Sequence, residues 1–206
     1  MNRSDLQSFF ESKLRQFGNS PRTLDWSERG QRVRFEVLYG IGAYEGKSVL
    51  DIGSGLGHFF GFLRERVSSF QYRGYDVVPK LVEAAHENYP DATFEVRDVL
   101  REGIDGRYDY VVSSGVHNLE TGNNEDEMRS LVGGAWNAAT EGIGINMLSR
   151  WSGKVEKDRH FYDPIEILRY ARRLTPLVVL RHDYLYHDFT IFLYRERPLT
   201  GSRPGS

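Results

Sequence analysis

Three glycines at alternate positions follow a short apolar run, and this segment constrains the fold more than any other. The run Val49–Ile52 contains one acidic residue, Asp51, and the glycines occupy positions 53, 55 and 57. An apolar stretch then begins at Phe59. The order strand, glycine turn and helix is how open α/β sheets form a cradle for a cofactor, because glycine permits a sharp turn and a close approach of the ligand to the main chain.

The spacing of these glycines separates two classes of ligand. A dinucleotide fingerprint of the form G-x-G-x-x-G would need a glycine at position 58, where the chain has His58. A diphosphate at a helix N-terminus also avoids a neighbouring carboxylate, and Asp51 stands two residues before the first glycine. The loop therefore disfavours a nicotinamide dinucleotide. The alternative is a glycine turn that serves only close packing, and the rest of the chain has to be compared with both.

Strand and helix patterns alternate regularly after Ser48. Apolar runs predict parallel strands at 49–52, 72–75, 93–96, 110–113 and 142–148, and helices at 59–66, 79–89, 124–139 and 163–174. Two β-rich runs close the chain, at 177–181 and 189–194. The pattern predicts an α/β fold: a Rossmann-like, doubly wound sheet, mostly parallel with an antiparallel C-terminal edge strand, plus N-terminal helical additions.

The chain is expected to form a single domain over residues 1–199. Two helical patterns precede the first strand, so residues 1–45 are predicted to form a helical roof and residues 46–199 the Rossmann-like core. The segment 200–206 is rich in glycine, serine and proline and is expected to be a disordered tail.

The composition removes several classes of chemistry. Without cysteine the chain has no disulfide, no thiolate metal site and no iron–sulfur cluster. Its six histidines show no H-x-x-x-H spacing, so no metal is expected. A net charge of −2 disfavours a nucleic-acid partner, and no apolar stretch approaches membrane-spanning length. A cytoplasmic protein is expected.

Three aspartates fall at the carboxyl ends of three successive predicted strands. They are Asp51, Asp76 and Asp98. The carboxyl ends of parallel strands meet at one edge of the sheet, which is where open α/β sheets bind ligands. Any one of these residues alone could be a solvated cap of a strand end. Three in register behind the glycine loop indicate a binding site instead.

The D-x-G-x-G-x-G loop, Gly74–Pro79 and Tyr108–Val112 resemble the first, second and fourth motifs of class I S-adenosylmethionine-dependent methyltransferases. The resemblance implies S-adenosylmethionine as cofactor and S-adenosylhomocysteine as product. It implies that Asp51 holds the cofactor's ammonium, Asp76 its ribose hydroxyls and Asp98 its adenine amino group. The apolar residues expected to sandwich adenine are Val77, Val78, Val99 and Leu100. The further residues expected at the cofactor are Gly53, Ser54, Gly55, Gly57, Phe59, Ser114, Gly115 and Arg34.

A narrower likeness extends over almost the whole chain. Several short segments are similar to those of a poorly characterised group of bacterial class I methyltransferases. Members of that group usually carry an apolar aromatic residue where this chain has His117, so no methyl acceptor is carried over from it. The similar segments are 13–15, 21–22, 25–26, 34–35, 113–118, 146–148, 182–184 and 188–190.

The candidate catalytic residues follow from the chemistry of methyl transfer. The protein has to hold the nucleophile roughly 3–3.5 Å from the methyl carbon, and a hydroxyl or ammonium nucleophile must also lose a proton. His117, just past the fourth strand, is the candidate base, and His160 and Tyr162 are further candidates near a loop. The alternative is a structural role for each of them, with His117 hydrogen-bonded to the sheet edge.

The candidate substrate-binding residues are Arg22, Trp26, His117 and Asn118. Arg22, Trp26 and Arg34 suit an anionic or planar ligand, or the cofactor's carboxylate. For Trp26 the alternative is a hydrophobic plug between the roof and the core.

The favoured function is methyl transfer from S-adenosylmethionine to an O, N or C nucleophile of a small molecule. The alternatives are an RNA or protein methyltransferase and a cofactor-binding protein without turnover. The Asn/Asp-Pro-Pro-Tyr/Phe signature of many amino-methylating nucleic-acid enzymes is absent, since the corresponding place reads Ser-Ser-Gly-Val-His-Asn at 113–118. The complete loop and the three aspartates argue against lost cofactor binding.

Overall fold

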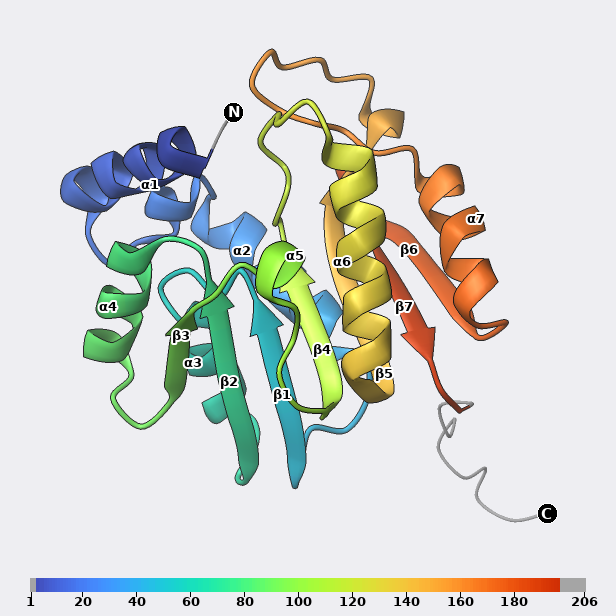
Figure 1. Ribbon diagram of the computed structural model, residues 1–206, viewed down its shortest axis with the longest axis horizontal. Helices are drawn as coiled ribbons and strands as arrows, with labels where there is room; N and C mark the ends of the chain where they lie inside the picture. The colour runs from blue at the N-terminus through green and yellow to red at the C-terminus, as the bar shows by residue number, and fades with distance from the viewer. Residues whose placement is uncertain (1–2, 197–206) are drawn as a thin grey trace.

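The computed structural model describes residues 3–196 and shows a seven-stranded sheet with helices on both faces (Figure 1). The strand order is β3-β2-β1-β4-β5-β7-β6. The strands are β1 (Lys47–Ile52), β2 (Phe70–Asp76), β3 (Thr93–Val96), β4 (Tyr108–Ser114), β5 (Ala139–Leu148), β6 (Val178–Leu185) and β7 (Asp188–Tyr194). The helices are α1 (Arg3–Phe17), α2 (Glu28–Tyr39), α3 (His58–Arg64), α4 (Pro79–Asn88), α5 (Val99–Glu102), α6 (Asn124–Ala138) and α7 (Pro164–Leu174), with the 3₁₀ helices η1 (Pro21–Leu24) and η2 (Arg150–Ser152).

The sheet confirms the fold class predicted from the sequence. Strands β1 to β5 pair in parallel, and β7 lies between β5 and β6 and runs antiparallel to both. Strand β7 is therefore antiparallel to the other strands, and the edge strand β6 runs in the same direction as β1 to β5. The strand order reverses between β1 and β4, which are neighbours in the sheet. The connections on the two sides of this point therefore run in opposite directions, which leaves a crevice at the carboxyl ends of β1 and β4.

Local sequence signals set the starts of the main helices. Ser27 caps α2 by accepting a hydrogen bond from the N–H of Gly30 at 3.0 Å. Asp163 caps α7 in the same way, at 2.8 Å from the N–H of Ile165. Helices α4 and α7 each begin with proline, whose missing N–H costs nothing in the first turn of a helix.

The core has two main parts, one on each face of the sheet. On one face the side chains of α6 and α7 pack on Leu50 and Ile145, and on the other α2 and α3 pack on Val49 and Val112. Val49 and Leu50 contact opposite layers because successive residues of a strand point to opposite faces. Burial of each of these aliphatic side chains contributes about 1.5–3 kcal/mol to the stability of the fold, so both layers hold the sheet that positions the site.

Helix α1 and η1 lie over the carboxyl edge of the sheet, whereas α2, in the same N-terminal segment, packs on one face of the sheet (Figure 1). Phe10 and Leu14 of α1 and Leu24 of η1 pack against Leu56 and Val78, which follow β1 and β2. The division at residues 45 and 46 and the single-domain assignment stay predictions. The predicted tail at 200–206 lies outside the described residues.

The structure differs from the sequence-based expectation at short elements. The helices η1, η2 and α5 were not expected, because three or four residues are too few for a periodic pattern. Strand β5 begins at Ala139, three residues before the predicted start, because α6 passes into it without a loop. Strand β6 extends to Leu185 through a segment that was expected to be a connection.

Candidate functional site

A cavity of about 630 Å³ lies at the carboxyl ends of β1, β2 and β4. Its floor consists of residues 51–54, 75–78 and 114–119, which end or follow these three strands. Helix α1, η1 and Trp26 cover it. Because the ligand crevice of an open α/β sheet lies where the strand order reverses, this cavity is the candidate site.

The glycine loop forms one wall of the cavity and needs its glycines. Gly53, Gly55 and Gly57 all have positive φ, at 76°, 54° and 76°. A Cβ atom at Gly53 would overlap the side chain of Val116, and one at Gly55 would lie 2.9 Å from Leu24. The loop therefore combines a left-handed backbone with contacts too close for any side chain.

Asp76 ends β2 with its carboxylate fixed by two main-chain donors. Its Oδ2 accepts from the N–H of Gly55 and its Oδ1 from the N–H of Val78, both at 2.9 Å. Burial raises the pKa of Asp76, and these hydrogen bonds oppose the rise. Each oxygen keeps a lone pair for a further donor, so the residue can bind a hydroxyl-bearing ligand while it ties the glycine loop to β2.

Asp51 lies at the floor of the cavity and is 4% exposed. The hydroxyl of Tyr72 donates to its Oδ2 at 2.6 Å. Burial raises the pKa of Asp51 to about 7, although the hydrogen bond from Tyr72 acts in the opposite direction. A buried carboxylate without a neighbouring cation is costly, so this position suits a positively charged ligand group.

Asp98 forms an ion pair with helix α1. Its Oδ1 caps α5 by accepting from the N–H of Leu100 at 3.1 Å, and its Oδ2 lies 2.6 Å from Nη1 of Arg3 in α1. Gln7, one turn further along α1, donates to the carbonyl oxygen of Val77 at 3.1 Å. Helix α1 is thus attached to the part of the cavity formed by Val77, Val99 and Leu100.

His117 lines the cavity beyond β4 and adopts a left-handed backbone, with φ of 62°. Its Nδ1 lies 3.2 Å from Oε2 of Glu127, on the first turns of α6. The hydrogen bond from His117 lowers the pKa of Glu127, whose Oε2 also accepts from the hydroxyl of Thr121 at 3.0 Å. The pair resembles the histidine–carboxylate arrangement in which the carboxylate orients a general base.

Solved structures of methyltransferases share this fold, and two of them are similar to most of this chain. Magnesium protoporphyrin IX methyltransferase from Synechocystis PCC 6803, with bound S-adenosylhomocysteine, gives a TM-score of 0.68 at 14% identity, over 94% of this chain and 99% of that one. The N-methyltransferase NodS from Bradyrhizobium japonicum WM9, also in complex with S-adenosylhomocysteine, gives 0.63 at 16% identity, over 91% and 99% of the two chains.

Two sequence comparisons also match methyltransferases. Residues 49–132, which include the glycine loop, Asp76, Asp98 and His117, match the family model of a methyltransferase domain. Rv1506c of Mycobacterium tuberculosis, a provisionally named methyltransferase, is 29% identical over 163 residues, which cover 74% of this chain and 96% of that protein. Together with the shared fold, these matches support a class I S-adenosylmethionine-dependent methyltransferase.

In this methyltransferase the side chain of Arg34 stacks on the ring of Trp26. Trp26 lines the cavity and packs so closely on Gly115 that a Cβ there would overlap its ring. The guanidinium of Arg34 lies over the same ring, 4.2 Å from its centroid, and pairs with Asp188 at 2.5 Å. Arg34 is buried and does not line the cavity, so it supports Trp26 from behind.

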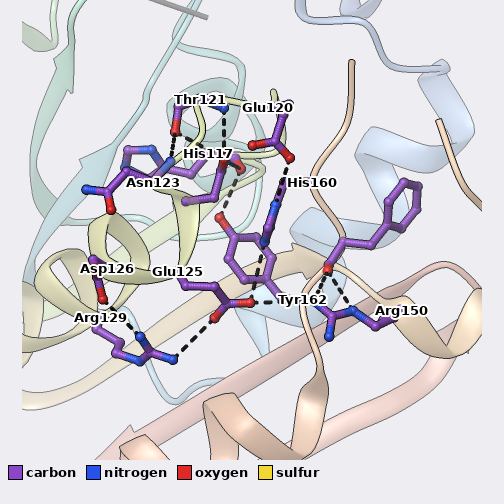
Figure 2. Close-up of polar contacts among 12 residues, drawn as sticks. His117, Glu120, Thr121, Asn123, Glu125, Asp126, Arg129, Arg150, His160 and Tyr162 are labelled. Carbon is purple, nitrogen blue, oxygen red and sulfur yellow. Dashed lines mark hydrogen bonds and ion pairs between the residues drawn. The ribbon is translucent and has the colours of Figure 1, made fainter. Parts of the chain in front are cut away.

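The other candidate residues divide between the cavity and its supports. Arg22 is exposed on η1, away from the cavity lining. His160 and Tyr162 also lie outside the lining: the ring of His160 lies 3.0 Å from Glu120, and the hydroxyl of Tyr162 donates to the carbonyl oxygen of His117 (Figure 2). Burial raises the pKa of Tyr162. The remaining candidates that line the cavity are Gly53, Ser54, Phe59, Val78, Ser114, Gly115 and Asn118.

Sequence reasoning missed several residues of the site. The sequence pattern marks Glu127 only as part of a predicted helix, in whose first turn it lies, ten residues after His117. Tyr72 carries no motif signal, yet it faces Asp51 from the neighbouring strand. His58 lines the cavity and contacts Gln31, at 3.1 Å. Only a structure shows these pairings, because they join separate elements.

Two further findings on the described residues concern metal ligands and membrane spans. In the range 3–196, no group of three or more histidine, aspartate or glutamate side chains is arranged to hold a metal ion. Over the same range, no helix combines the length and apolar character needed to cross a membrane.

Proposed function

We propose that this methyltransferase acts on an oxygen or nitrogen atom of a small molecule and that His117 is the general base. The proposal depends on one observation: His117 lines the cavity while its Nδ1 faces the carboxylate of Glu127. A base in this position is useful only for a nucleophile that carries a proton. A carboxylate acceptor needs none.

The cavity fits S-adenosylmethionine. Asp51 offers a buried carboxylate for the ammonium, and Asp76 has a free lone pair on each oxygen for the ribose hydroxyls. Val77, Val99 and Leu100 offer apolar surface for the adenine ring beside Asp98. Arg3 attaches α1 to Asp98, so this helix would cover the adenine. When bound, S-adenosylmethionine supplies a methyl group attached to a positively charged sulfur.

The pair with Glu127 determines what His117 can do. A carboxylate can only accept a hydrogen bond, so the Nδ1 of His117 carries the proton that faces Glu127. The neutral ring then has its lone pair on Nε2. Among the described residues Nε2 has no hydrogen-bond partner. With S-adenosylmethionine bound, Nε2 would take the proton from the O–H or N–H of the acceptor as its oxygen or nitrogen bonds to the methyl carbon. The bond from that carbon to sulfur would break in the same step, and S-adenosylhomocysteine would leave with a neutral sulfur. Glu127 stabilises the imidazolium that forms.

The shape of the site supports a small acceptor. The roof of α1, η1 and Trp26 encloses the cavity, which has a volume of about 630 Å³. Trp26 and Leu119 supply apolar surface near His117, and Asn118 and Thr121 supply polar groups. The similar structure from Synechocystis is named for a small molecule, magnesium protoporphyrin IX, which supports the same class of acceptor here.

The proposal is tested with S-adenosylmethionine carrying an isotopically labelled methyl group. The purified protein is incubated with a panel of phenols, alcohols, amines and carboxylic acids, and transfer is measured by mass spectrometry. We expect methylation of a phenol, alcohol or amine. His117→Ala should reduce its rate by about 10²–10⁴-fold, which is the usual contribution of a general base.

The matched control is His86→Ala, which removes a histidine of α4 that contacts the carbonyl oxygen of Phe94 outside the cavity. It should leave the rate unchanged. Full activity of the His117→Ala variant would show that His117 is not the base. Transfer confined to carboxylic acids would overturn the proposed acceptor class.

A further inference from the structure

The main chain of His117 is held by two buried side chains. Its carbonyl oxygen accepts from Nδ2 of Asn124 and from the hydroxyl of Tyr162, both at 2.9 Å. Asn124 is 2% exposed and Tyr162 is fully buried. Residues other than glycine seldom adopt a positive φ, so the left-handed conformation of His117 depends on the contacts that surround it.

Asn124 uses its whole amide on the loop that carries His117. Its Nδ2 also donates to the carbonyl oxygen of Leu119 at 2.8 Å, and its Oδ1 accepts from the N–H and hydroxyl of Thr121 at 2.8 and 3.0 Å. The same hydroxyl lies 3.0 Å from Oε2 of Glu127. The network therefore connects the backbone of His117 to the partner of its ring.

Tyr162 reaches His117 from a second segment, residues 158–162, which runs along the loop (Figure 2). The N–H of His160 donates to the carbonyl oxygen of Asn118 at 3.0 Å. The ring of His160 lies 3.0 Å from a carboxylate oxygen of Glu120. The N–H of Tyr162 itself donates to the carbonyl oxygen of Leu148 at 2.9 Å, and together these contacts give its hydroxyl a defined position.

We propose that Tyr162 and Asn124 are positioning residues that act on His117 through its main-chain carbonyl. This inference rests on the proposed function of His117. Rotation about the φ dihedral of His117, which has an unfavourable positive value, moves its carbonyl and its side chain together. If the carbonyl is released, the ring moves away from Glu127 and Nδ1 loses its acceptor.

The consequence is a change of tautomer. In the native arrangement Glu127 holds the proton of His117 on Nδ1 and leaves Nε2 free to accept. When the ring moves away from Glu127, the proton is free to reside on either nitrogen. A ring with the proton on Nε2 cannot accept a proton there, so the base is lost without any change in the residues that touch the acceptor.

The test is Tyr162→Phe, which keeps the ring and its packing and removes only the hydroxyl. Long-range ¹⁵N–¹H correlation spectra of the full-length, ¹⁵N-labelled protein report the tautomer of each histidine. The signals of His117 are assigned by their loss in His117→Gln. We expect the Nδ1–H tautomer in the wild type and a shift of its population toward Nε2–H in Tyr162→Phe.

Tyr44→Phe is the matched control. The hydroxyl of Tyr44 also donates to a main-chain carbonyl, that of Leu38, at 3.0 Å, and the residue is 2% exposed outside the cavity lining. This variant should lose the same kind of buried hydrogen bond and leave the tautomer of His117 as it is. The same tautomer in the wild type and Tyr162→Phe would overturn the inference, as would an equal shift in both variants.

A double-mutant cycle gives a second, independent measurement with any acceptor found in the methyl-transfer screen. Tyr162→Phe should lower kcat by about tenfold in the wild type and have no further effect in His117→Ala, because it acts through His117. Equal effects in both backgrounds would contradict positioning. Full activity of His117→Ala would refute the proposed base alone, since the spectra decide the positioning role without any acceptor.

Discussion

The hydroxyl oxygen of Tyr72 lies 2.6 Å from Oδ2 of Asp51, and this hydrogen bond joins β2 to β1 at the floor of the cavity. Val49 and Tyr72 are partners in the register of the two parallel strands. The hydroxyl of Tyr72 therefore reaches the carboxylate two residues further along β1. Burial alone would keep Asp51 protonated to a higher pH, so Tyr72 makes the carboxylate available near neutral pH.

Cofactor affinity should fall as the pH falls through about 7. The pKa of Asp51 is raised to about 7 by burial, so below this pH the residue is neutral and no longer attracts a cationic ligand. Calorimetric titration with S-adenosylmethionine between pH 5.5 and 7.5 should show weaker binding at the lower values. Asp51→Asn cannot titrate, and its affinity should be low and nearly constant. A wild-type affinity that does not vary with pH would contradict this role.

Tyr72→Phe should move this dependence to higher pH. Loss of this hydrogen bond disfavours the charged form of Asp51 by about 1.5 kcal/mol, so less of the protein carries the carboxylate at pH 7 and S-adenosylmethionine should bind up to about tenfold more weakly. The pKa of Asp51 rises further when this hydrogen bond is removed. Calorimetry at pH 7 measures the loss, and Tyr44→Phe serves as the control. Equal affinities of Tyr72→Phe and wild type would show that Tyr72 has only a packing role.

His58 should make the protein sensitive to acid. Its Nδ1 accepts from Gln31 at 3.1 Å, so its Nε2 donates to Asn19 at 2.7 Å, and burial lowers its pKa to about 4. The unfolded chain binds a proton at this histidine near pH 6.5, and the folded protein does not until about pH 4. Stability from this group is therefore complete above pH 6.5 and is lost as the pH falls toward 4, by about 2 kcal/mol.

His58→Gln removes this titration. Urea unfolding between pH 4.5 and 7 should show a smaller loss of stability with falling pH for His58→Gln than for the wild type. Parallel curves for the two proteins would mean that His58 is not the group responsible.

The sequence allowed the sheet and the cofactor edge to be predicted because both depend on local patterns. Short apolar runs separated by segments with helical periodicity predict β1 and β2. The aspartates near their carboxyl ends, Asp51 and Asp76, lie at the same edge in any parallel sheet. The glycine loop likewise depends on backbone geometry within a few residues. These features need no knowledge of which side chains meet across the fold.

Side-chain pairings across the fold could not be predicted in this way. Asp25 contacts Arg159, which is 134 positions away, and Arg34 contacts Asp188. Such pairs depend on how the roof and the loops pack. Tyr162 illustrates the limit: its position beside a loop makes it a catalytic candidate, but nothing in the sequence indicates that its hydroxyl donates to the carbonyl oxygen of His117.

Asp25→Asn should loosen the roof of the cavity. The carboxylate of Asp25 contacts Lys13 of α1 through one oxygen and Arg159 of the loop after β5 through the other. Its φ of 63° is one that asparagine also tolerates, so the substitution removes charge with little backbone strain. We expect S-adenosylmethionine to dissociate a few-fold faster, since exposed ion pairs contribute up to about 1 kcal/mol. Stopped-flow fluorescence measures this rate.

Glu36→Gln removes a comparable charge on α2, where Glu36 contacts Arg66 at 3.1 Å outside the cavity lining. Its dissociation rate should equal that of the wild type. Asp25 would have no role in closing the roof if both variants released the cofactor at the wild-type rate.

Gly115 and Gly122 separate backbone strain from contact with Trp26. Both glycines have positive φ, at 73° and 88°, but a Cβ at Gly115 would overlap the ring of Trp26, and one at Gly122 would meet no atom within 4 Å. Gly122→Ala should therefore cost only the strain of a left-handed alanine, about 1–2 kcal/mol. Gly115→Ala should cost this and a further 1–3 kcal/mol of overpacking. It should also displace Trp26 and change the tryptophan fluorescence. Equal unfolding free energies and unchanged fluorescence in both variants would show that Trp26 does not pack on Gly115 in solution.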